Sequence, residues 1–64
     1  MKIKKFDVVE LNNGNRATIF EIKGKEEYFA EIVNPYGITI DTRIITNDEI
    51  REVVYSKNEL RKEL

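Results

Sequence analysis

The chain has 64 residues, with eleven basic and twelve acidic side chains and with neither cysteine nor histidine. This composition excludes disulfides, thiolate metal sites and the common nucleophile–base pairs that depend on cysteine or histidine. The near-neutral charge argues against a dedicated nucleic-acid-binding protein, in which basic residues are usually in excess. A domain of about 60 residues buries only about 60% of the surface that its unfolded chain exposes, which leaves tight apolar packing or self-association to stabilise it.

The first residues form a charged lead-in, with three lysines around Ile3 in the segment Met1–Lys5. No signal-peptide core follows Met1 and Lys2, and no apolar run approaches the ~20 residues needed to cross a bilayer. We therefore expect a cytoplasmic location. Charges at this end also protect the edge of a sheet from pairing with other chains.

The strongest local signal is Asn12-Asn13-Gly14-Asn15, which lies between the apolar runs Phe6–Leu11 and Arg16–Ile22. An Asn-Gly pair between two such runs predicts a β-hairpin with a type I′ turn, because both central residues of that turn need positive φ. In the first strand of this hairpin we expect Val9 and Leu11 to point inside.

The second strand changes its pattern partway. Ala17 and Ile19 share one face, whereas Phe20 and Ile22 share the other. Such a slip in a two-residue period predicts a β-bulge or a sharp bend. The polar segment Lys23–Glu27 then predicts a loop.

Two further strands are expected around a tight turn. Tyr28–Val33 alternates, and Asn34-Pro35-Tyr36-Gly37 has the residue preferences of a type I turn. The segment Ile38–Ile44 is a regularly alternating strand. One of its faces carries Ile38, Ile40 and Ile44.

The last part of the chain combines two capping-box patterns with a short strand. Thr46-Asn47-Asp48-Glu49 predicts a single 3-10 turn, and Val53–Tyr55 predicts the last strand, with Ile50 packing at its entrance. Ser56-Lys57-Asn58-Glu59 heads a tail with leucines at positions 60 and 64, which is helical only if those leucines dock. We assign residues 1–56 to the domain and residues 57–64 to this tail.

The opening of the chain resembles that of the SH3-like barrels, especially the compact bacterial versions and the KOW-type modules. The resemblance rests on Phe6–Leu11, Gly14 and Ala17-Thr18-Ile19, and extends over residues 5–55. It implies an all-β fold: a small five-stranded antiparallel barrel with one 3-10 turn before the last strand and a short C-terminal helical tail. KOW modules usually carry glycine where this chain has Ala17. Peptide-binding SH3 domains need a long first loop and a tryptophan, and this chain has a four-residue loop and no tryptophan.

We expect a non-catalytic protein without a cofactor, because no motif holds two of its carboxylates together and so small a barrel offers little concave volume. The chain has more large apolar residues than a small barrel can hide, which predicts a protein partner or a homo-oligomer. Phe20 and Phe29 are expected at the centre of the interaction surface. The candidate surface comprises Phe20, Phe29, Tyr36, Leu60 and Leu64.

The alternative is a KOW-like module associated with RNA or DNA. Basic residues near exposed aromatic rings would bind phosphates while the rings stack on bases. The glutamates interleaved with the same segments weaken this alternative. The candidate nucleic-acid contacts are Lys4, Lys5, Arg16, Lys23 and Lys25.

Overall fold

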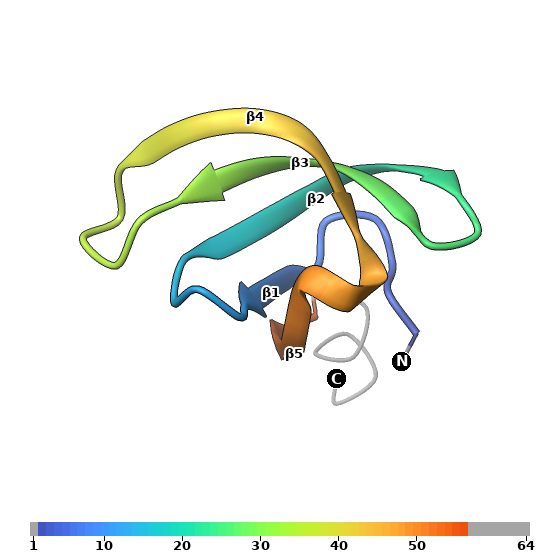
Figure 1. The fold of residues 1–64 in the computed structure, drawn as a ribbon, viewed down its shortest axis with the longest axis horizontal. Coiled ribbons are helices and arrows are strands. Elements are labelled where there is room, and N and C mark those ends of the chain that lie inside the picture. Colours follow the sequence, from blue (N-terminus) through green and yellow to red (C-terminus); the bar gives the residue numbers. More distant parts are fainter. Residues whose placement is uncertain (1, 57–64) are drawn as a thin grey trace, which may run out of the picture.

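The computed structural model describes residues 2–56, which form a single antiparallel sheet (Figure 1). The elements are β1 (Val8–Leu11), β2 (Arg16–Gly24), β3 (Glu27–Val33), β4 (Thr39–Thr46), the 3-10 turn η1 (Asn47–Glu49) and β5 (Ile50–Tyr55). The strand order is β4-β3-β2-β1-β5. The all-β class, the five strands and the 3-10 turn before the last strand agree with the sequence. No ladder joins β4 to β5 within residues 2–56, so the sheet is not closed into the barrel that was expected.

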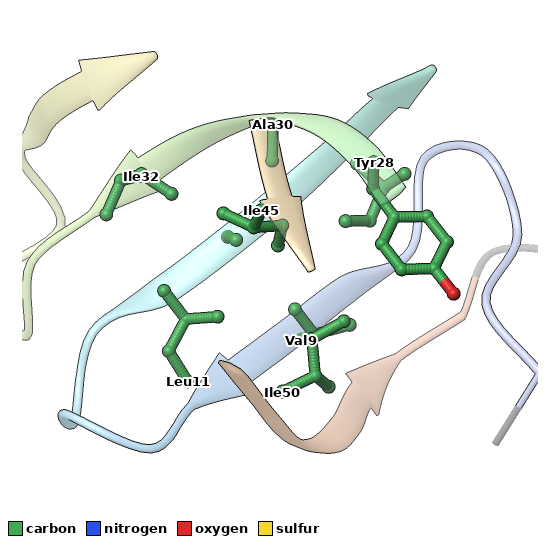
Figure 2. Close-up of a cluster of buried hydrophobic side chains, with 9 residues drawn as sticks. Val9, Leu11, Tyr28, Ala30, Ile32, Ile45 and Ile50 are labelled. Atoms are coloured by element: carbon green, nitrogen blue, oxygen red, sulfur yellow. The ribbon is translucent and has the colours of Figure 1, made fainter. Parts of the chain in front are cut away.

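The sheet curves strongly, so that β2, β3 and β4 arch over β1 and β5 (Figure 1). The side chains inside this curve form one apolar core (Figure 2). Val9 and Leu11 are buried there, as predicted. The buried core residues are Val9, Leu11, Ala17, Ile19, Tyr28, Ala30, Ile32, Ile45 and Ile50.

The turn between β1 and β2 differs from the predicted type I′ turn. Gly14 has a φ of 95°, but Asn13 does not take a positive φ. The Gly14 N–H donates to the Leu11 carbonyl (3.0 Å), and the Leu11 N–H donates to the Asn15 carbonyl (2.8 Å). This is the geometry of a three-residue connection, in which a turn is followed by a single glycine in the left-handed region. The Asn13 side chain accepts a hydrogen bond from the Asn15 N–H (3.0 Å). This bond favours the three-residue connection over the two-residue connection of a type I′ turn.

The bulge predicted in the second strand is confirmed. The pairing of β2 with β3 shifts between Ile19 and Glu21, so Phe20 is an extra residue with no partner in β3. The strand also runs longer than expected, to Gly24. Only residues 25 and 26 remain in the turn that leads to β3.

β4 is a strand, as predicted, but the prediction that its isoleucines share one face through regular alternation is wrong. The register with β3 shifts between Ile32 and Val33, which pair with Asp41 and Thr39, and Ile40 is left without a partner. Because a one-residue shift reverses the facing of every later side chain, the alternation does not continue along the strand. Ile45 is the isoleucine of β4 that is buried. Ile38, which precedes β4, and Ile40 and Ile44 within it are exposed.

The 3-10 turn η1 connects β4 to β5 and is fixed from both sides. The carboxylate of Glu49 accepts the Thr46 N–H (2.9 Å), as the capping-box pattern predicts. The Tyr28 hydroxyl bonds to the Asn47 side chain (3.1 Å), and the Asn12 N–H donates to the Glu49 carbonyl (2.9 Å). These bonds hold β4 near β5 although the two strands are not paired. Ile50 is buried at the start of β5, as expected.

The free edge of β4 is partly occupied by its own side chains. The Thr42 N–H donates to Asp41 Oδ1 (2.8 Å), and Arg43 Nη1 donates to the Ile44 carbonyl (3.1 Å). Together with the Thr46 N–H, these groups belong to alternate residues of the strand. Because the main-chain groups of successive residues point to opposite sides of a strand, those of every second residue lie on the same side of β4.

Candidate interaction surface on the outer face of the sheet

A tight turn precedes β1 and places an aromatic residue in an unfavourable conformation. The Asp7 N–H donates to the Lys4 carbonyl (3.1 Å), and the Lys4 N–H donates to Asp7 Oδ2 (2.9 Å). Between them Phe6 has a φ of 72°, in the region that favours glycine. A left-handed conformation costs roughly 1–2 kcal/mol for an ordinary residue. Asp7 is buried and holds this turn closed, whereas the side chain of Phe6 is 49% exposed.

Two main-chain hydrogen bonds place Phe6 beside the bulge of β2. The Phe6 N–H donates to the Ile19 carbonyl (2.6 Å), and the Ile19 N–H donates to the Asp7 carbonyl (2.9 Å). The lead-in thus continues the β1–β2 pairing for two more residues. Phe6 thereby lies next to the Ile19–Phe20 segment, where Phe20 is 37% exposed.

The register then extends this arrangement across the sheet. Phe29 in β3 lies opposite Glu21, the residue after the bulge, and Ile44 in β4 lies opposite Phe29. Phe29 alternates with the buried residues Tyr28 and Ala30, and therefore points to the outer face. Ile44, which is 42% exposed, precedes the buried Ile45 and faces the same way. We call Phe6, Phe20, Phe29 and Ile44 the phenylalanine row; it contains all three phenylalanines of the chain.

A second apolar pair adjoins the row on the side of β1 and β5. Val8 lies two residues after Phe6, opposite both Thr18 in β2 and Tyr55 in β5. Tyr55 is exposed and Val8 is half-buried. The apolar area therefore continues from the row toward the last strand.

Two of the candidate residues lie on neighbouring strands: Phe20 at the bulge of β2, and the half-buried Phe29 in β3. That they form the centre of an interaction surface stays a prediction. Tyr36 is 88% exposed in the turn between β3 and β4, outside the row. Leu60 and Leu64 lie outside the described residues. Ile44 was not among the candidates, and it could have been found only from the register between β3 and β4.

The five basic candidates are distributed along β2 and the lead-in. Arg16 begins β2 whereas Lys23 and Lys25 lie at its other end, roughly 25 Å away for an extended strand. Lys23 pairs with Glu21 (3.4 Å). Lys4 and Lys5 belong to the turn before β1, and Lys5 Nζ lies 5.3 Å from the centre of the Phe6 ring.

The best-formed ion pair lies away from the row, between β4 and η1. Arg43 Nη2 is 2.8 Å from Glu49 Oε1, and Arg43 Nη1 is 3.4 Å from Glu49 Oε2. The hydrogen bond from Arg43 and then that from the Thr46 N–H lower the pKa of Glu49. The bond to Glu49 likewise raises the pKa of Arg43. This pair fixes the 3-10 turn.

Other features of the described residues give no chemical site. Residues 2–56 contain no group of three acidic, histidine or cysteine side chains placed to hold a metal ion. The helical part of the same region is too short to span a membrane. A shallow hollow lies between the turns at Gly14 and Gly37, lined by Glu10, Arg16 and Val33.

Comparisons with known proteins identify no relative. No family model matches the chain, and neither a curated protein nor a solved structure is significantly similar to it.

Proposed function

We propose that this protein is a non-catalytic interaction module with an SH3-like fold, and that the phenylalanine row is its contact surface for another protein. The observation that carries the proposal is the exposure of Phe6, Phe20 and Ile44 around the half-buried Phe29, on neighbouring segments of the sheet. Contiguous exposed apolar residues mark interaction sites, and aromatic residues are enriched in them. The strand order and the 3-10 turn before β5 support the SH3-like assignment.

The conformation of Phe6 supports the same surface. A glycine at this position would remove the strain of a positive φ, yet the chain has a large aromatic residue that is half exposed. Strained residues in native proteins cluster at functional sites. The contribution of Phe6 to stability does not explain an aromatic ring at this position, and we infer that the ring has a function.

Affinity capture from the native cell, followed by mass spectrometry, tests this function. Phe20→Ser removes a ring of the row at an exposed bulge. Ile40→Thr is the matched control. It removes an exposed apolar group that lies on β4 outside the row, and threonine keeps the β-branched shape. We expect proteins captured by the wild type and by Ile40→Thr to be depleted about tenfold or more with Phe20→Ser, as is usual for an interface hot spot. Equal capture by Phe20→Ser would refute the proposal, as would the absence of any enriched protein.

A nucleic-acid-associated function is the second candidate, favoured by Lys5 beside the exposed ring of Phe6. A basic group next to a stacking platform is the basis of single-strand binding. Filter binding of RNA and DNA at low salt tests it. Salt-sensitive binding that is lost with Lys5→Ala and Phe6→Ala would favour this candidate over a protein partner.

A further inference from the structure

The outer face, to which Phe29 and Ile44 of the phenylalanine row point, is rich in carboxylates. The alternation of each strand, counted from its buried residues, assigns most of its charged side chains to this face or to the core. Arg16 is the base that alternation places on the outer face, and Lys5 lies over the ring of Phe6. Lys23 and Arg51 are exposed at register shifts, where alternation does not fix the side. The acids on the same face are Glu10, Glu21, Glu27, Glu31 and Glu52.

Three of these carboxylates have different surroundings. Glu10 in β1 lies between Arg16 in β2, which has the opposite charge, and Glu52 in β5, which has the same charge. Glu31 lies between Thr18 and Thr42 in the neighbouring strands. Within residues 2–56 none of these three glutamates takes part in an ion pair. Glu31 therefore presents a negative charge that neither of its cross-strand neighbours compensates.

These carboxylates lie at a short, fixed distance from the apolar side chains. Glu31 follows Phe29 by two residues in β3, and Glu10 follows Val8 by two residues in β1, so each is about 6–7 Å along its strand from an apolar neighbour. A peptide ligand whose apolar residue contacts the row would place the residues one or two positions along its own chain over these carboxylates. Basic groups at those positions would meet opposite charge.

We infer that the ligand of this surface is a basic segment of a partner protein, in which lysine or arginine flanks an aromatic or aliphatic residue. The inference rests on the proposed function and names the partner chemistry of the same surface. A second copy of this chain matches the surface less well, because both faces in the contact would carry the same excess of glutamates. Charge complementarity of this kind contributes to specificity and to the rate of association.

Selection from a library of random displayed peptides on the full-length protein tests the inference. We expect the enriched peptides to combine an apolar anchor with at least two basic residues. We expect Glu31→Lys to weaken their binding by about fivefold. Glu26→Lys is the matched control, because it makes the same change in net charge at the exposed turn between β2 and β3, off the outer face. It should bind as the wild type does.

The outcomes separate this inference from the proposed function. Peptides that lose binding with Phe20→Ser but carry no basic excess, or bind equally to Glu31→Lys, would leave the interaction surface in place and overturn the basic partner. Equal loss with Glu26→Lys and Glu31→Lys would also overturn it, since only the overall charge would then matter. Peptides that bind Phe20→Ser as well as the wild type, or a selection that enriches none, would count against both proposals.

Discussion

Two turns of this protein place a residue at positive φ beside β1, and they use opposite kinds of side chain. After β1, Gly14 takes a φ of 95° and nothing lies within 4 Å of the position that its Cβ would occupy. Before β1, Phe6 takes a φ of 72° with a large aromatic side chain. The turn after β1 uses glycine, the residue that adopts a positive φ without steric cost.

The difference shows what each turn does. The Gly14 turn has no side chain to present, and it sets the register of β1 and β2. The Phe6 turn accepts backbone strain and presents a ring at the end of the phenylalanine row. Asp7 compensates part of that strain, because its buried carboxylate accepts the Lys4 N–H and closes the turn. One turn serves the fold, and we propose that the other serves the surface.

The largest effect is expected at the glycine. Gly14→Val forces a β-branched residue to positive φ and should lower the free energy of unfolding by about 2 kcal/mol. Chemical denaturation measures the change. Gly24→Val is the control, since Gly24 has ordinary φ and its added Cβ would meet only Glu27 at ordinary contact distance. A Gly14→Val protein as stable as Gly24→Val would show that the turn tolerates a side chain.

A smaller effect of opposite sign is expected at Phe6. Substitution by glycine and by alanine removes the same ring, so the difference between the two variants isolates the backbone strain. We expect Phe6→Gly to be more stable than Phe6→Ala by about 1 kcal/mol. At Val8, in the regular part of β1, alanine should instead be more stable than glycine by about 0.5–1 kcal/mol. Denaturation curves showing the same order at both positions would contradict strain at Phe6.

The smallest effect on stability is expected at Glu49, whose carboxylate stabilises the 3-10 turn η1. The pKa of Glu49 is lowered in the folded protein, so its contribution to stability is present above the ordinary value of 4.5 and is lost as the pH falls below it. The pair is partly exposed to solvent, so this contribution should be below about 1 kcal/mol. Thermal unfolding across that pH range should show a smaller decrease for Glu49→Gln than for the wild type. Parallel pH profiles would mean that the Arg43 bond adds nothing.

Much of the fold follows from short-range patterns in the sequence. The hairpin at Gly14, the bulge at Phe20 and the capping box at Thr46 depend on residues that are close along the chain, and each was found. Of the details that failed, the type of the turn at Asn13-Gly14 is local, whereas the facing of the isoleucines depends on partners far along the chain. The facing of Ile40 and Ile44 is set by the register with β3, where Ile32 pairs with Asp41 and Val33 with Thr39.

The candidate surface could be predicted only in part, again because some of its residues are brought together by the register of the strands. Phe20 and Phe29 could be identified as surplus apolar residues, but Ile44 joins them only through pairing across β3 and β4. The positive φ of Phe6 could not be predicted, because local preferences point to glycine at such a position. The opposed pair of Glu10 and Glu52 also depends on the contact between the first and last strands, which no local pattern specifies.

The side chains along the free edge of β4 bear on how this protein behaves when it is concentrated. An unpaired edge strand is a template for stacking further chains, which leads toward aggregation and fibre formation. Here Asp41 and Arg43 bond to main-chain groups that an incoming strand would need. Such a strand would first have to displace both side chains. The protein can thus expose apolar side chains on its outer face while the neighbouring edge resists polymerisation.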